Sequence, residues 1–324
     1  MNNFGINMEV NRMKRVIEKV IKLMIVLVIL ASGFGGLSAA KAEENYKIGF
    51  STKMYSGNAF WVALVDAVED GIHAGDEYVM YDAQQDIQKQ IQHIEDLIAN
   101  EFDAIIVSAS DSEALNPVLK KANENGIKVI IVDSGVSDDT VYETAIMNDN
   151  IEAANKIVEF LDDKLNGEGK VITYYDTLTD QSLQKGRTVQ EGMQELGYEV
   201  VHVDGVGTVD EAITKLEAAV QANPDVKAIH CLNGPSGDGA ISALLSAGIL
   251  DQVLVTSIDA SKADIENIKN GRLAAAGTQK PNEMGSYAVE AAYKALKGEE
   301  LDKVTTVPAD IITEENVDSY EPLF

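Results

Sequence analysis

The chain has little positive charge and almost no cysteine, and both shortages narrow what it can be. Of its 324 residues, 26 are basic and 53 are acidic, which gives a formal net charge of −27. A surface this acidic repels phosphate backbones, so nucleic acid is not expected as a partner. Cys231 is the single cysteine, which excludes an intrachain disulfide. It lies in the apolar run KAIHCLN, where we expect it to be buried.

Features typical of enzymes and metal proteins are also missing. The four histidines, at positions 73, 93, 202 and 230, lack metal-ligand spacing, and there is no G-x-S-x-G elbow and no EF-hand loop. The segment NGPSGDG (233–239) follows a strand-like run, as a phosphate loop does, but no Gly-Lys-Ser/Thr follows it. We therefore expect a simple turn into a helix, no metal, no cofactor and no catalytic residues. Turnover of a substrate would revive the enzyme alternative.

The N-terminus has the three parts of an export signal. A basic segment precedes the apolar run 23–37, and SAAKA then supplies small residues at Ala40 and Ala42. Cleavage after Ala42 would leave 282 residues with a net charge of −31. The alternative is an uncleaved membrane anchor, but the apolar core is short for a span of about 20 residues.

This leader predicts a periplasmic or extracellular location, with retention at the membrane if the signal helix stays attached. No cysteine follows the apolar run, which excludes lipid attachment at such a cysteine. Methionines at positions 1, 8 and 13 leave the start open.

From residue 43 onward, strand-like runs alternate with amphipathic helical stretches. Ile87, Ile91, Ile94 and Leu97, for example, lie on one face of a helix. Such alternation predicts an α/β fold with parallel sheets covered by helices on both faces. The ten expected strands are 46–52, 77–82, 103–109, 128–133, 144–149, 170–176, 198–204, 228–233, 253–259 and 273–279.

Ten strands exceed one small sheet, so we expect two doubly wound lobes. The break falls near 146–150, where two strand-like runs come close together. The expected leader covers residues 1–42.

Polar and aromatic residues follow several of these runs at the point where each run ends. Carboxyl ends of parallel strands meet at one edge, which is where open α/β sheets bind ligands. Taken singly, each residue has a plainer interpretation as a helix cap, a solvated arginine or core packing. Together they suit a small polyol, since carboxylates, amides and a guanidinium bond hydroxyls and aromatic faces cover C–H groups. The set is Asn58, Phe60, Trp61, Asp133, Ser134, Arg187, Asn233, Asp259 and Gln279.

Six motifs in this order resemble the periplasmic sugar-binding proteins of the ribose/galactose type, which serve ABC transporters. They are GNAFW, IIVDS, DQSLQKGRTVQEGM, CLNGPSGDGAISAL, TSIDAS and AAGTQKPNEMG, and the resemblance covers about residues 45 to 313. It implies a type I periplasmic binding fold and ligand roles for the candidate set, with Trp61 stacking on a sugar. The resemblance further implies an N-terminal lobe (43–147 and 280–308) and a C-terminal lobe (148–279 and 309–324), with the chain crossing between them three times, near Asn148, Gln279 and Pro308. It also implies a monosaccharide ligand and a membrane permease as partners. We expect a monomer.

Two departures from the family pattern bear on specificity. The family's arginine after the strand-end aspartate is Ser134 here, which puts ribose itself in question, and Ala59 replaces a turn proline. A sugar that bridges both lobes would favour the closed form, which a permease recognises.

Two further alternatives come from the same fold. A transcription regulator of the lactose-repressor type would need an N-terminal helix-turn-helix, where this chain has an apolar signal. A sensor that presents its closed form to a membrane receptor or kinase is not separated from a transport protein by the sequence.

Overall fold

The computed structural model describes residues 45–55, 59–177 and 180–324. The expected leader and Asn58 lie outside these ranges. Residues 46–324 form one compact unit. None of the helices in the described part of the chain has the length and the apolar run needed to cross a membrane.

The first lobe is a six-stranded parallel sheet in the order β2-β1-β3-β4-β5-β11. Successive residues of its strands point to opposite faces, as Ile130 and Ile131 show by joining different core clusters. The strands are β1 (Lys47–Thr52), β2 (Glu77–Asp82), β3 (Ala104–Val107), β4 (Lys128–Val132), β5 (Thr144–Asn148) and β11 (Val304–Val307).

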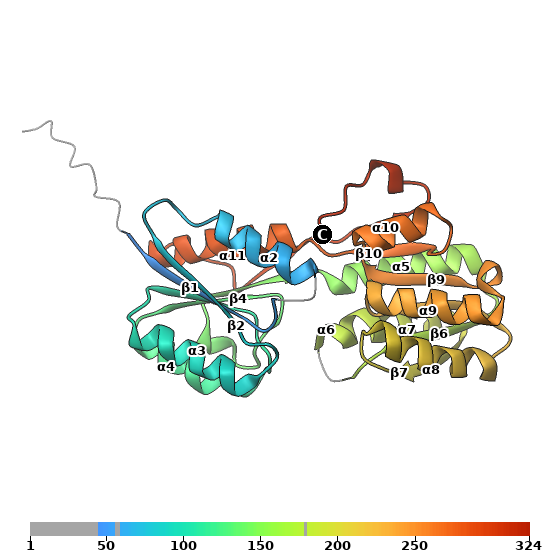
Figure 1. Cartoon of the computed structure of the whole chain (residues 1–324), viewed down its shortest axis with the longest axis horizontal. Coiled ribbons are helices and arrows are strands. Elements are labelled where there is room, and N and C mark those ends of the chain that lie inside the picture. Colours follow the sequence, from blue (N-terminus) through green and yellow to red (C-terminus); the bar gives the residue numbers. More distant parts are fainter. Residues whose placement is uncertain (1–44, 56–58, 178–179) are drawn as a thin grey trace, which may run out of the picture. The chain divides into compact units, whose positions relative to one another are not determined.

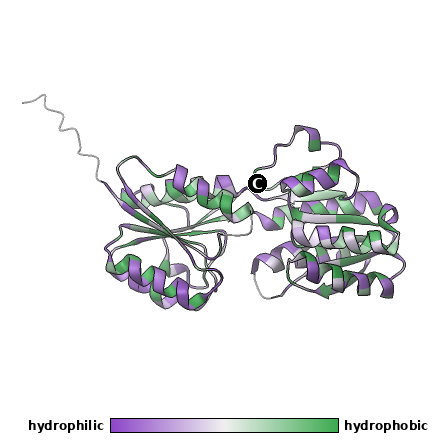
Figure 2. Ribbon diagram, viewed as in Figure 1, coloured by the Kyte–Doolittle hydropathy of each residue, from purple (hydrophilic) through white to green (hydrophobic). Residues whose placement is uncertain are grey.

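Helices cover both faces of this sheet (Figure 1). One face packs against α2 (Ala59–Asp70) and α11 (Pro281–Leu296), and the other against α3 (Ile87–Ala99) and α4 (Asn116–Glu124). A short 3-10 turn, η1 (Asp139–Val141), leads into β5. Hydrophilic and hydrophobic residues lie side by side along these helices (Figure 2), because each helix buries one stripe and exposes the rest.

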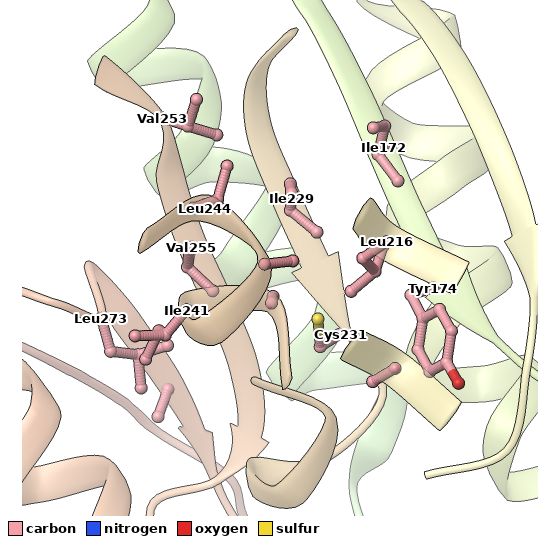
Figure 3. Close-up of a cluster of buried hydrophobic side chains, with 14 of the residues drawn as sticks. Ile172, Tyr174, Leu216, Ile229, Cys231, Ile241, Leu244, Val253, Val255 and Leu273 are labelled. Atoms are coloured by element: carbon pink, nitrogen blue, oxygen red, sulfur yellow. The ribbon is translucent and has the colours of Figure 1, made fainter. Parts of the chain in front are cut away.

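The second lobe repeats this order as β7-β6-β8-β9-β10-β12, with one difference: its last strand runs antiparallel to its neighbour. Buried residues of neighbouring strands, among them Ile172, Ile229 and Val255, meet Leu216 and Leu244 from the covering helices (Figure 3). The strands are β6 (Lys170–Tyr175), β7 (Glu199–Asp204), β8 (Val226–Cys231), β9 (Leu254–Asp259), β10 (Ala275–Thr278) and β12 (Ile311–Thr313). Cys231 is fully buried in this core, as expected from its apolar run.

The helices of the second lobe also lie on both faces of the sheet. One cluster joins α5 and α7 to the sheet, and the other joins α8, α9 and α10 to it. The helical segments are α5 (Asn150–Leu165), α6 (Asp180–Ser182), α7 (Thr188–Glu195), α8 (Val209–Ala222), α9 (Gly234–Ala247), α10 (Lys262–Lys269), a π-helical turn η2 (Leu183–Arg187), and the 3-10 turns η3 (Leu250–Gln252) and η4 (Val317–Ser319).

The chain passes between the two sheets three times, which confirms the expected fold class. The crossings lie between β5 and α5, between β10 and α11, and between β11 and β12. All ten expected strands are present as β1–β10. The sequence missed β11 and β12, because most of their residues are exposed or half-buried and form no apolar run, unlike the equally short but fully buried β3 and β10.

The last residues, 309–324, contact both lobes, and the Phe324 carbonyl accepts a hydrogen bond from the Lys262 amide of the second lobe at 2.9 Å. Ile312 and Val317 do join the core of the second lobe. Phe324, however, packs edge-on against Phe60 of the first lobe at 5.7 Å between ring centroids. An apolar side chain follows the nearest available core, which here belongs to the other lobe.

Candidate ligand-binding site

Charged side chains from both lobes gather where the parallel strands end. Lys53 follows β1, Asp133 follows β4, Asp176 follows β6 and Asp259 ends β9. The charges of Asp133, Lys185 and Asp176 all act on the Lys53 ammonium, and those of Lys185 and Asp133 act on Asp259. The carboxyl-end edges of the two sheets therefore contribute to one electrostatic cluster.

In the first lobe, Lys53 contacts both Ser134 and Asp133. Its ammonium donates a hydrogen bond to the Ser134 hydroxyl and lies 3.7 Å from Asp133 Oδ2. Ser134 Oγ in turn donates to the same carboxylate oxygen at 2.6 Å. Burial lowers the pKa of Lys53, and the Asp133 carboxylate opposes that shift. A lysine and a serine thus satisfy one face of the strand-end aspartate.

The backbone presents Asp133 in an uncommon conformation. Its φ is +60°, in the left-handed region that non-glycine residues seldom adopt. Its amide donates to the Ile146 carbonyl at 2.9 Å, and its carbonyl accepts from Gln181 Nε2 of the second lobe at 2.6 Å. Such backbone geometry is often found where a side chain is aimed at a ligand.

Phe60 and Trp61, at the start of α2, are both only 6% exposed and belong to the core of the first lobe. Their rings meet edge to face at 5.0 Å. The Lys53 ammonium lies over the Trp61 ring, 4.9 Å from its centroid, as a cation–π contact. A protein cation therefore lies against one face of Trp61, the residue to which the resemblance assigns stacking on a sugar.

In the second lobe, the backbone anchors Asp259. Its Oδ2 accepts a hydrogen bond from the Gly234 amide at 3.0 Å, at the start of α9. Burial raises the pKa of Asp259 to about 7, although the Lys185 ammonium and the Gly234 bond oppose this shift. Its φ of +140° is again unusual for a side chain of this kind.

Asn233 acts as the N-cap of α9. Its Oδ1 accepts from the amide and the hydroxyl of Ser236, at 3.0 Å and 2.6 Å, and its Nδ2 donates to the Gly207 carbonyl at 3.1 Å. One N–H of the amide remains beyond these bonds. The capping role and a ligand role are therefore compatible for this residue.

Gln279 lies at a crossing between the lobes and is 3% exposed. Its Nε2 donates to Asn150 Oδ1 at 3.2 Å, and Asn148 Nδ2 donates to the same oxygen and to the Thr278 carbonyl. Asn148 Oδ1 is buried and has no partner among the described residues. Gln279 is thus bonded within an amide network at two of the crossings.

The structure does not bring Arg187 to the cluster. Arg187 is exposed and interacts with the Tyr175 hydroxyl, whereas Lys185, two residues earlier, reaches Asp259 and Lys53 electrostatically. The π-helical turn carries both residues, and a wider turn changes which side chains share a face. His230, whose pKa burial lowers to about 4, lies 3.2 Å from the Lys185 carbonyl and supports this turn.

The pattern of the sequence did not identify Lys53, Asp176 and Lys185 as residues of the site. Lys53 stands directly after a strand-like run, so the rule that found Asp133 would have found it too. Asp176 was read as the end of its strand, and it accepts a hydrogen bond from Ser182 at 2.7 Å. Lys185 gave no signal, because a π-helical turn cannot be recognised from residue spacing.

A cavity of about 340 Å³ opens beside the cluster, lined by Lys53 and Ser134 from the first lobe and by Gln181 and Gln184 from the second. This volume is in the range of small-molecule sites. Within the described ranges, no three His, Cys, Asp or Glu side chains converge to hold a metal ion. Two α/β lobes with a polar site at their facing strand ends define a two-lobed solute-binding protein.

Comparison with known proteins agrees with this class. Residues 48–300 match the family model described as periplasmic binding protein domain, and the chain belongs to that family. It is 28% identical to the ribose import binding protein of Bacillus subtilis over 277 residues, which cover 84% of this chain and 88% of that one. It is also 28% identical to the D-ribose/D-allose-binding protein of Pseudomonas aeruginosa, covering 93% and 99%.

Among solved structures, the chain is similar to an ABC transporter solute-binding protein from Bacillus halodurans with bound myo-inositol. The TM-score is 0.80 at 25% identity, over 86% of this chain and 98% of that one. These relatives are solute-binding proteins rather than enzymes, in agreement with the prediction from the sequence.

Proposed function

We propose that this protein captures a monosaccharide or related small polyol between its lobes and delivers it to the permease of an ABC importer. The proposal rests on the strand-end cluster, in which Asp133 and Asp259 come from opposite lobes and the charge of Asp133 acts on the Asp259 carboxyl. A ligand that bonds to both lobes stabilises the closed form more than the open one.

The polar groups suit hydroxyl recognition. Carboxylates accept hydrogen bonds from hydroxyls, and ammoniums donate to hydroxyl and ring oxygens. Asp133, Asp259, Lys53 and Lys185 supply both kinds of partner. The names of the relatives, which refer to ribose, allose and myo-inositol, support the same ligand class.

We further propose that residues 43–147 with 280–308 and residues 148–279 with 309–324 move as the two lobes, and that the protein acts as a monomer. Light scattering with and without ligand measures the mass. We also propose export through the leader, with cleavage after Ala42. The mass of the exported protein tests this, because cleavage there leaves 282 residues.

The deciding experiment is a calorimetric titration of the purified protein against ribose, allose, xylose, arabinose, galactose, glucose, fructose, myo-inositol and a furanosyl signalling molecule. We expect tight binding of one or two of these without turnover. Absence of heat with every compound would show that the ligand class is wrong. For a compound that binds, its uptake by cells with and without this gene then separates transport from sensing.

A further inference from the structure

The first lobe lacks the arginine that the family pattern places after the strand-end aspartate, yet its edge does not lack a cation. Ser134 occupies the arginine position and is 4% exposed. The Lys53 ammonium donates to its hydroxyl and lies 3.7 Å from Asp133 Oδ2. The two residues are 81 positions apart, so this cation arrives from a different strand.

Three contacts place the Lys53 ammonium at the point where a ligand would meet the first lobe. These are the Ser134 hydroxyl, the Asp133 carboxylate and the face of Trp61. The Ser134 hydroxyl links the ammonium to the carboxylate, since it accepts from the ammonium and donates to Asp133 Oδ2 at 2.6 Å. The Lys53 side chain keeps 23% of its surface exposed, and it also lines the cavity beside the cluster.

The donor count leaves room for a ligand. An ammonium has three N–H donors, of which Ser134 takes one and Asp133 engages a second. One donor remains for an acceptor oxygen of the ligand. An arginine fork, by contrast, would offer two parallel donors in a fixed plane.

We propose that Lys53 replaces the missing arginine as the cationic donor of the first lobe, and that it selects ligands that present a single acceptor oxygen beside Asp133. This inference rests on the proposed function and assigns the specificity of that same site. An arginine guanidinium donates to two adjacent oxygens at once, whereas a lysine ammonium on its flexible side chain donates to one oxygen from any of several directions. The pair Lys53 and Ser134 therefore sets a different hydroxyl preference from that of an arginine-bearing relative.

The test moves the cation between the two positions. Affinities for the ligand found in the panel, and for ribose and allose, are measured for Lys53→Met, Ser134→Arg and the double variant. We expect Lys53→Met to weaken binding about tenfold or more, because a charge-assisted hydrogen bond is lost. Ser134→Arg alone weakens it as well, since two cations then compete for one carboxylate.

The double variant decides the proposal. We expect it to recover about tenfold in affinity relative to Lys53→Met, with a preference shifted toward sugars that offer two adjacent oxygens. Lys53→Gln, which keeps donors but not the charge, covers the case in which Lys53→Met does not fold. The matched control is Lys128→Met, which removes a lysine paired with Glu143 at the start of β4 and is expected to leave affinity within about twofold.

Two results would overturn the inference: affinity of Lys53→Met and Lys53→Gln within about twofold of the unaltered protein, or a folded double variant that binds no better than Lys53→Met. Failure of the proposed function looks different, because the unaltered protein then binds no compound of the panel.

Discussion

The two lobes share one strand order but hold their site residues in different ways. In the second lobe, backbone amides donate to two of the site residues: Asp259 accepts from the Gly234 amide, and Asn233 accepts from the Ser236 amide as it caps α9. In the first lobe, Asp133 is held by other side chains, those of Lys53 and Ser134. A hydrogen bond from a backbone amide persists when side chains are substituted, whereas a hydrogen bond from a side chain is lost when that side chain is replaced. The first lobe is thus the one in which specificity can diverge while the second keeps its geometry.

In each lobe, two helices pack closely against each other at a glycine. Substitution of these glycines is expected to have the largest effect on stability. A methyl group at Gly285 would lie 2.6 Å from the Leu64 carbonyl of α2, and one at Gly239 would lie 2.5 Å from Ala212 of α8. We expect Gly285→Ala and Gly239→Ala each to lower the free energy of unfolding by about 3 kcal/mol through overpacking. Denaturant unfolding measures both.

Gly135→Ala is the matched control for these glycines, because its methyl group would meet only Met147, at 3.9 Å. Equal stability of all three variants would show that the helix crossings tolerate a wider spacing. A loss in only one of the two variants would show that the helix crossing of the other lobe accommodates a methyl group.

The carboxylates of the two lobes should respond with opposite sign. Burial raises the pKa of Asp259, so its charge is unfavourable in the folded state, and we expect Asp259→Asn to stabilise the protein by about 2 kcal/mol at pH 8. Asp133→Asn should destabilise it by about 1 kcal/mol, because the buried Lys53 ammonium loses its counter-ion. Both variants should bind sugar poorly. The same sign for both changes would contradict the contrast between the lobes.

The effect of Asp259 also predicts a pH dependence. Its folded-state pKa of about 7 lies above the unfolded value of 3.8, so the folded protein binds the extra proton between these values. The contribution of Asp259 to stability therefore increases as the pH falls from about 7 toward 4. The advantage of Asp259→Asn should shrink over the same window. Thermal unfolding of both proteins at several pH values measures this, and a constant difference would contradict it.

Lys185 and Arg187 provide a comparison within one turn of the second lobe. Lys185 acts on Asp259 and Lys53, whereas Arg187 is exposed beside Tyr175. We expect Lys185→Ala to weaken sugar binding about tenfold and Arg187→Ala to change it by less than about twofold. Titration calorimetry distinguishes them, and a larger loss for Arg187→Ala would restore the role that the resemblance implies for it.

The smallest expected effect concerns the contact between the lobes. Gln181 Nε2 donates to the Asp133 carbonyl at 2.6 Å. Loss of one neutral hydrogen bond in Gln181→Ala should alter sugar affinity by about 1 kcal/mol, or fivefold. Trp61 is the single tryptophan and lies beside Lys53, so its fluorescence follows the same titration. An unchanged affinity would indicate that the contact breaks before the ligand binds.

The sequence alone predicted the fold far better than the site. Apolar runs that alternate with helical stretches identified β1–β10, because strands buried on both faces of a sheet consist of consecutive apolar residues. Strand ends also pointed to Asp133 and Asp259, which lie in one cluster. Arg187 was expected there as well, but the π-helical turn places Lys185 in its stead. The spacing of residues along the chain does not reveal that a helical turn contains one extra residue.

By itself, the sequence predicted two doubly wound lobes, an acidic surface and the lack of an intrachain disulfide, since periodicity, charge and cysteine count are local or summed properties. Only the tertiary structure decided which charges share the site. Lys53 reaches Ser134 across 81 positions of the chain, and the Phe324 ring packs against Phe60 of the first lobe while its carbonyl accepts from the Lys262 amide of the second. Such contacts depend on where separate strands end in space, and no pattern along the chain records that distance.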